Sequence, residues 1–166
     1  GYHTSLSGKW HLGSGEGERP HERGFERSFG IHGGVAGHFA DAQSFRPSAE
    51  VPYYLDGDPV ELPADFFSTT AYTDRLIECI DEALDQGRPF FAYGAYTAPH
   101  WPIQAPEAWL DRYVGAFDDG YDALRERNLA AAVEQGLVPA GATAPPRNPF
   151  APAWHELSDE ERAASA

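Results

Sequence analysis

The sequence of 166 residues carries 26 Asp and Glu against 12 Lys and Arg, which gives a formal net charge of −14 at pH 7. This acidic balance disfavours a nucleic-acid-binding protein, because such proteins present a basic stripe to the phosphates. Hydrophobic residues make up 42% of the chain and aromatic residues 13%, which is typical of a globular fold, and no apolar run is long enough for a membrane span.

The first part of the chain is predicted to form one strand followed by a long loop region. Residues 1–14 are expected to form a strand or an extended edge that ends in a glycine-rich loop. Residues 15–65 are rich in Gly, Pro, His and charge and show little periodicity, which indicates loops with short strands. Within them, residues 51–55 and 60–62 flank a DG turn at residues 56–57 and predict a small hairpin.

The most regular segment is predicted to form an α-helix over residues 69–86, ended by Gly87 and Pro89. Cys79, the single cysteine, falls in this helix and is interpreted as a small buried hydrophobic residue; it excludes an internal disulfide. Apolar residues at helical spacing predict one buried stripe, which consists of Leu76, Ile77, Ile80, Ala83 and Leu84.

The helix is followed by residues 90–96, a continuous apolar and aromatic run that predicts a strand covered on both faces. A helix followed by a buried strand is typical of an α/β sheet. Further helices are predicted near residues 106–113 and over residues 119–135. Residues 137–153 are proline-rich and predict a rigid extended connection, and residues 158–161 form a capping box that predicts another helix start.

Candidate chemistry begins with the run GKWHLG at residues 8–13. If the backbone is extended there, Lys9 and His11 point to the same side, and the flanking glycines allow close approach of a ligand. An ammonium with three donors beside an imidazole suits an oxyanion. The spacing does not match a phosphate-binding P-loop, because Trp10 stands where Ser or Thr is required. The alternative interpretation is a glycine-rich surface turn with a solvated lysine.

A second candidate, His100, follows the strand predicted over residues 90–96, at the sheet edge where ligands bind in open α/β proteins. Pro99 and Pro102 restrict the backbone on either side of it. The alternative interpretation is a loop histidine whose ring is satisfied by a backbone carbonyl. Neighbouring side chains are expected to shape the pocket rather than to react, namely Tyr96, Thr97 and Trp101.

Three motifs resemble, in the same order, motifs of the sulfatase family. Residues 1–13, GYHTSLSGKWHLG, match the signature G-Y-x-T-x-x-x-G-K-W-H-L-G at every fixed position. Residues 20–26, PHERGFE, are similar to the segment P-x-x-R-G-F-[DE]. Residues 89–102, PFFAYGAYTAPHWP, resemble a strand followed by T-x-P-H-x-P. The resemblance implies an α/β fold of the alkaline-phosphatase type, a mixed sheet with flanking helices, of which only part is present.

The resemblance also implies an arylsulfatase-like sulfuric ester hydrolase that acts on a small-molecule sulfate ester. Such enzymes use a formylglycine nucleophile and a calcium ion. By its position in the signature, Lys9 is implied to contact the sulfate and the nucleophile. His11 is implied to hold a hydroxyl of the hydrated aldehyde and to act as the base that expels sulfate. His100 matches the histidine that contacts the ester and the leaving oxygen, which makes it the candidate proton donor or electrostatic stabiliser.

The chain departs from the family pattern in parts that the reaction needs. The nucleophile motif, C-x-P-x-R or S-x-P-x-R, is absent, and Cys79 is followed by IDE instead. The early acidic metal-binding pair, the later D-N metal-binding pair and the second active-site lysine are also absent, so no metal ligand is expected here. The acidic pair at residues 118–119 opens a predicted helix and suits stabilisation of the helix dipole.

We therefore expect residues 1–166 to be a partial N-terminal catalytic domain, inactive alone, of an active parent enzyme. Two alternatives stay open. One is a phosphonate or phosphate ester hydrolase of the same superfamily, because a shared fold does not fix the substrate. The other is a non-catalytic protein that has kept the pocket walls. The remaining histidines carry no site argument and are expected on the surface or in structural positions: His3, His21, His32, His38 and His155.

Overall fold

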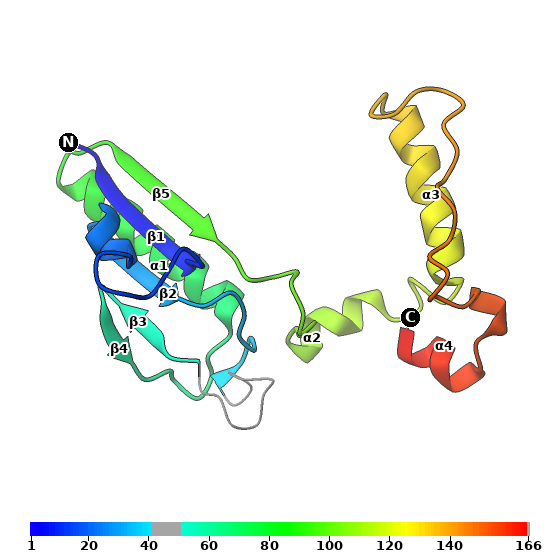
Figure 1. Cartoon of the computed structure of the whole chain (residues 1–166), viewed down its shortest axis with the longest axis horizontal. Helices are drawn as coiled ribbons and strands as arrows, with labels where there is room; N and C mark the ends of the chain where they lie inside the picture. Colours follow the sequence, from blue (N-terminus) through cyan, green and yellow to red (C-terminus); the bar gives the residue numbers. More distant parts are fainter. Residues whose placement is uncertain (41–50, 166) are drawn as a thin grey trace. The chain divides into compact units, whose positions relative to one another are not determined.

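The computed structural model describes residues 1–40 and 51–165, which divide into two compact units, Gly1–Ala105 and Pro106–Ala166. We call them unit 1 and unit 2. Unit 1 contains the β-sheet and all three sequence motifs, whereas unit 2 is helical (Figure 1). No helix in the described residues is both long enough and apolar enough to cross a membrane.

The sheet of unit 1 has five strands in the order β4-β3-β2-β1-β5. The central strand β1 (His3–Lys9) is parallel to β2 (Arg27–Ile31) on one side and to β5 (Phe90–Ala95) on the other. The strands β3 (Tyr53–Leu55) and β4 (Asp58–Val60) form an antiparallel hairpin on β2. The mixed sheet and the hairpin are as predicted. The first strand, β1, lies inside the sheet between β2 and β5, and it is second from the edge formed by β5.

Two glycines allow the three parallel strands to lie close together at one end. Gly8 of β1 stands opposite Ala95 of β5 and Gly30 of β2. A Cβ on Gly8 would lie 2.0 Å from the Ala95 carbonyl oxygen, and a Cβ on Gly30 would lie 1.8 Å from the Gly8 carbonyl oxygen. Their φ angles are +126° and +147°, which side chains rarely adopt. The close approach that Gly8 permits is therefore that of a neighbouring strand.

Helix α1 (Ser68–Asp85) matches the predicted helix and packs on β1 and β5. Cys79 is buried in it, as predicted. The predicted buried stripe is wrong for Ile77 and Leu84, whose exposed fractions are 52% and 61%. The prediction is confirmed for Ala83, which is buried, while Leu76 and Ile80 are half-buried and Tyr72, outside the predicted stripe, enters the core. The buried residues of the helix are Ser68, Tyr72, Cys79 and Ala83.

The core lies beside β2 and β3 and is largely aromatic. The hydroxyl of Tyr72 donates to that of Tyr53 at 3.1 Å, so these two buried phenols satisfy one another. Burial raises the pKa of Tyr53, which keeps its hydroxyl protonated. The buried members of the core are Ile31, Ala36, Tyr53, Phe66 and Tyr72.

Strand β5 corrects the expectation of a strand covered on both faces. It is the edge strand of the described sheet, and Phe91 and Tyr93 are 54% and 47% exposed. On this face the ring of Phe25 packs against both rings and covers them only in part, with centroid distances of 6.2 and 6.5 Å. The apolar sequence of β5 correctly predicts a strand. Burial of its side chains would also require a neighbouring strand on its outer side, and no strand of the described residues lies there.

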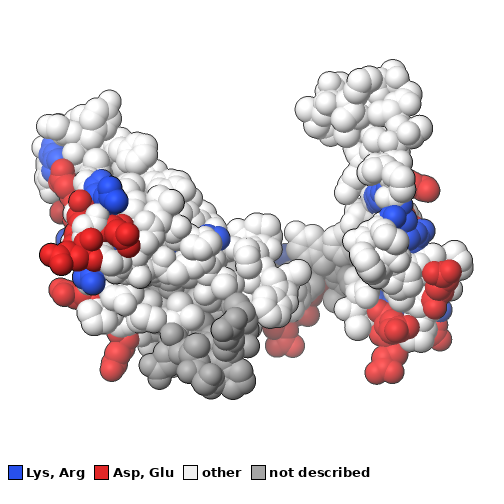
Figure 2. Space-filling model, in the orientation of Figure 1, with Lys and Arg blue, Asp and Glu red and all other residues white. Residues whose placement is uncertain are grey.

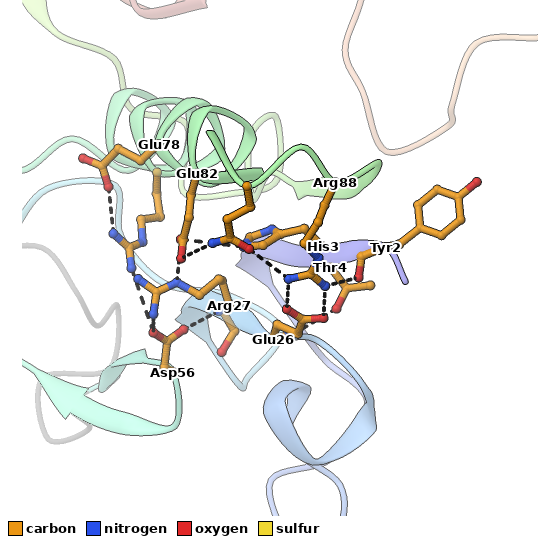
Figure 3. Close-up of polar contacts among 12 residues, drawn as sticks. Tyr2, His3, Thr4, Glu26, Arg27, Asp56, Glu78, Glu82 and Arg88 are labelled. Atoms are coloured by element: carbon orange, nitrogen blue, oxygen red, sulfur yellow. Dashed lines mark hydrogen bonds and ion pairs between the residues drawn. The ribbon is translucent and has the colours of Figure 1, made fainter. Parts of the chain in front are cut away.

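Polar contacts tie together the end of the sheet where the parallel strands begin (Figure 3). Arg27 lies 2.7 Å from Asp56 and 3.2 Å from Glu82. Arg88 binds both carboxylate oxygens of Glu26, at 2.6 and 2.9 Å. Figure 2 shows that, on the face in view, most acidic and basic side chains of unit 1 gather toward this end. Arg27 and Arg88 are thus engaged with carboxylates at the end of the sheet opposite to the carboxyl ends of the parallel strands.

Unit 2 confirms the helices predicted after the third motif. They are α2 (Glu107–Leu110), α3 (Gly120–Glu134) and α4 (Asp159–Ser165). The capping box forms as predicted: the Glu161 amide donates to Ser158 Oγ at 3.2 Å, and the Ser158 amide donates to the Glu161 carboxylate at 2.8 Å. Short 3₁₀ turns occupy Pro20–Arg23 in unit 1 and Asp111–Tyr113 and Trp154–Glu156 in unit 2.

Candidate active site

The three predicted site residues lie at one edge of the sheet, where β1, β2 and β5 end. Lys9 is the last residue of β1 and stands opposite Ile31 of β2. His11 follows Lys9 by two residues, and His100 follows the end of β5 by five. Carboxyl ends of neighbouring parallel strands share an edge, so the topology brings these residues to the same side of the molecule. Within the described residues, no hydrogen bond joins the three side chains to one another.

Lys9 is half-buried, and its ammonium has neither an ion pair nor a hydrogen bond with any residue that the structure describes. It is also the only lysine of the sequence. In contrast, Arg27, Arg75 and Arg88 of the same unit all contact carboxylates. An ammonium without a partner is unexpected in a chain of net charge −14. Its three donors are available for an anion at the sheet edge.

His11 continues the pairing of β1 with β2 but departs from extended backbone. Its amide donates to the carbonyl of His32 at 3.1 Å, while its φ is +55°, in the left-handed region. The prediction that Lys9 and His11 point to the same side assumed an extended backbone. The backbone at His11 is not extended, so this assumption does not hold. The imidazole lies against Gly34, where a Cβ would come within 2.7 Å of its Cε1 and Nε2 atoms. The bare backbone of Gly34 makes room for the ring.

His32 lies at the same edge, directly after β2, and it was not predicted as a site residue. Its ring stacks on Tyr54 with a centroid distance of 3.9 Å and an interplanar angle of 3°. Burial, with a further contribution from the positive charge of Arg19, lowers the pKa of His32. A neutral, stacked imidazole is suited to shaping the wall beside His11. Recognising β2 as a strand would have exposed this signal, because His32 is the residue that follows it.

His100 sits in a turn, with its amide donating to the Thr97 carbonyl at 2.9 Å. Its Nδ1 lies 2.5 Å from the carbonyl oxygen of Trp101. A carbonyl only accepts, so Nδ1 carries the proton and Nε2 is the nitrogen left for other chemistry. The alternative interpretation, a ring satisfied by a backbone carbonyl, thus holds for one nitrogen. The ring itself is exposed.

The three neighbours of His100 that were expected to shape the pocket differ in their exposure. Thr97 is buried, with 5% of its surface exposed, and its side chain lies beside the hydroxyl of Tyr72. Tyr96 is 39% exposed and its hydroxyl lies 2.8 Å from Thr73 Oγ1. Trp101 is 58% exposed. Thr97 therefore anchors the turn, whereas the two aromatic residues present surface beside it.

The described residues do not fit the metal or the nucleophile of the family pattern. Among them, no group of three or more His, Cys, Asp or Glu side chains converges as a metal site. Asp119 of the candidate acidic pair binds Arg127 instead. Burial raises the pKa of the Cys79 thiol, which opposes the thiolate form that a nucleophile needs. The chemistry that this part of the chain can supply is anion binding and proton transfer.

Comparisons with known proteins agree with the motifs. A family model described as Sulfatase matches residues 1–159. An uncharacterized sulfatase of Schizosaccharomyces pombe is 36% identical over 174 residues, which covers 100% of this chain and 31% of that protein. An arylsulfatase of Klebsiella aerogenes is 37% identical over 164 residues, which covers 98% of this chain and 35% of that protein. This chain thus spans about a third of the length of these relatives.

A solved structure supports the fold. The crystal structure of Ps i-CgsB in complex with k-i-k-neocarrahexaose matches 68% of this chain and 27% of its own, with a TM-score of 0.58 and 28% sequence identity. Together with the mixed sheet and its flanking helix, this confirms the α/β fold class that the sequence motifs implied. The match of the family model to most of the chain establishes the relationship: the chain belongs to the sulfatase family.

Proposed function

We propose that the complete protein is an arylsulfatase-like sulfuric ester hydrolase and that residues 1–166 supply part of its N-terminal catalytic domain. The observation that carries this proposal is the unpartnered ammonium of Lys9 at the sheet edge that also bears His11 and His100. The 37% identity to a protein named arylsulfatase supports the substrate class. The roles below concern side chains of this chain alone, because its described residues do not fit the nucleophile or the calcium ion.

Lys9 is proposed to hold the sulfate group of the ester. Hydrolysis of a sulfate monoester places negative charge on the equatorial and leaving oxygens in the transition state. A fixed ammonium aimed at these oxygens lowers the barrier, because it needs no reorganisation as the charge develops. Since the field of the whole acidic chain repels an anion, attraction has to come from such a local group.

His100 is proposed to donate a proton to the leaving oxygen through Nε2, acting as the imidazolium in which both ring nitrogens carry a proton. Its Nδ1 proton is engaged by the Trp101 carbonyl, which fixes the orientation of the ring. His11 is proposed to contact the nucleophile and to remove a proton when sulfate is expelled. The contact of its ring with Gly34 sets where the imidazole lies.

The first test is replacement of Lys9 by alanine in the complete enzyme. We expect kcat/KM toward 4-nitrophenyl sulfate to fall about 10²–10³-fold, the usual loss for one transition-state donor. Release of 4-nitrophenol measures the rate. Arg162→Ala removes one positive charge from α4, where the guanidinium pairs with Asp159, and is expected to leave the rate unchanged.

The same enzyme assayed with 4-nitrophenyl phosphate separates the proposal from the related phosphate ester hydrolase. A sulfatase is expected to prefer the sulfate ester by a wide margin. Preference for the phosphate ester would replace the proposed substrate class and keep the proposed site. Wild-type activity that survives Lys9→Ala unchanged would refute the role of the ammonium.

A second test displaces His11 without touching it. In Gly34→Ala the new Cβ would lie 2.7 Å from the imidazole, so the ring has to move. A shift of about 1 Å is expected to lower kcat roughly 10–100-fold. Gly33→Ala is the matched control, because a Cβ there meets no atom within 4 Å. Equal activity of the two variants would show that the position of the His11 ring does not matter for the rate.

A further inference from the structure

The loop that carries His100 is exposed in the middle and held at its two ends. His100 itself is exposed, and the next residues, Trp101 and Ile103, are 58% and 87% exposed. At the near end, buried Thr97 accepts the His100 amide through its carbonyl, and its side chain lies beside the hydroxyl of Tyr72 of α1. A loop with so little apolar burial depends on polar contacts at its ends to keep one conformation.

The far end of the loop is held by Gln104. Its Oε1 accepts the backbone N–H of His38 at 2.8 Å, a contact between residues 66 apart in the sequence. His38 is 2% exposed, so loss of this acceptor would leave a buried amide without a partner. Formation of the contact is therefore strongly favoured. On the loop it uses the side chain of Gln104 and not the backbone.

His38 is itself firmly placed. Its Nδ1 lies 2.7 Å from Ser68 Oγ, and its carbonyl accepts the Ser68 amide at 2.9 Å. Ser68 is fully buried and is the first residue of α1. Gln104 thus connects the loop to the beginning of α1, the helix whose Tyr72 lies beside Thr97. Both ends of the His100 loop are thus placed relative to the same helix, α1.

We propose that Gln104 is a positioning residue that holds His100 in place by binding the amide of His38. The proposal deepens the function proposed above and rests on it. Gln104 does not touch the reacting atoms in this scheme. It restricts the loop so that Nε2 of His100 meets the leaving oxygen, and proton donation falls when this distance and angle are lost.

The test compares two side chains of similar size in the complete enzyme. Gln104→Leu removes the acceptor oxygen, whereas Gln104→Glu keeps it. With phenyl sulfate, whose leaving group needs a proton, Gln104→Leu is expected to lower kcat about 10–100-fold. With 4-nitrophenyl sulfate, whose leaving group is a stable anion, the loss is expected to be about 3-fold or less. Gln104→Glu should restore both rates, and KM should change little.

A double-mutant cycle shows whether Gln104 acts through His100. In a His100→Ala background, Gln104→Leu should have no further effect on kcat, because the group that it positions is gone. Equal losses for the two substrates, or a full additional loss in the His100→Ala background, would overturn the proposal. Gln104→Ala, which adds no apolar bulk, is the second variant should Gln104→Leu fold poorly, and the same outcomes apply to it.

The outcomes also separate this proposal from the proposed function. Wild-type activity that is lost in His100→Ala but retained in Gln104→Leu rejects the positioning role and leaves the hydrolase in place. Absence of sulfate ester hydrolysis in the wild type rejects the proposed function and, with it, this role. Amide hydrogen exchange adds an independent readout, since faster exchange over residues 98–103 in Gln104→Leu is expected and unchanged exchange would contradict the proposal.

Discussion

Replacing His100 with alanine is expected to lower kcat of the complete enzyme toward phenyl sulfate about 10²–10⁴-fold, the usual contribution of a positioned proton donor. The side chain is exposed, so its removal opens no cavity in the core. KM should change little, because the ammonium of Lys9 still holds the sulfate. Steady-state kinetics, together with a thermal melt to verify folding, measure both effects.

His155→Ala supplies the matched control for this substitution. His155 is also exposed and lies in the 3₁₀ turn Trp154–Glu156 of unit 2. The sequence assigns it no site role, and the control is expected to leave kcat unchanged. A His100→Ala enzyme with wild-type kcat toward phenyl sulfate would remove this histidine from the proton transfer, whatever the effect of changes at Lys9.

Replacing Gly30 with alanine is expected to destabilise the fold by about 3 kcal/mol or more, among the larger effects of single substitutions. The new Cβ would lie 1.8 Å from the carbonyl oxygen of Gly8. This atom belongs to the backbone of the central strand, which cannot move without breaking its pairing with β2 or β5. The φ of +147° strains any side chain in addition. Tm is expected to fall by about 6 °C or more, with a lower soluble yield.

The control for Gly30→Ala lies three residues along the same segment. Gly33 has an ordinary φ, and a Cβ there meets no atom within 4 Å. Gly33→Ala is therefore expected to change the stability by about 0.5 kcal/mol at most. If both variants melt at the wild-type temperature, the close approach of β1 and β2 at Gly8 and Gly30 does not exist in solution.

Local signals in the sequence predicted the elements whose formation depends on neighbouring residues. The helical spacing before Gly87 gave α1 within one residue at each end. The DG turn at residues 56–57 gave the hairpin, and the pattern of Ser158 and Glu161 gave the start of α4. Each of these features is fixed by contacts within a few residues, which is why they can be predicted from sequence.

The interior of the sheet could not be predicted in the same way. Strand β2 has the sequence RSFGI, in which Ser28 and Gly30 interrupt the apolar run expected of a buried strand. Tertiary contacts explain why these two residues occur in the strand. The Ser28 amide donates to Asp56, and Gly30 makes room for β1. The exposure of Ile77 and Phe91 was missed for a related reason, because burial depends on what packs against a residue.

The site divides along the same line. Lys9, His11 and His100 are recognised from motifs, and the parallel pairing of β1 with β5 explains why distant motifs share an edge. The contacts that orient these side chains join residues far apart in the chain. Gly34 lies against the His11 ring and Gln104 binds His38, and no local sequence pattern predicts either contact.

The isolation of Lys9 has a practical consequence. Every other cationic residue of these 166 residues is an arginine, so the span offers one primary amine on a side chain. Reductive methylation with ¹³C-formaldehyde would place a single lysine probe in this span, at the carboxyl end of the central strand. Its NMR signal would report anion occupancy directly, without turnover.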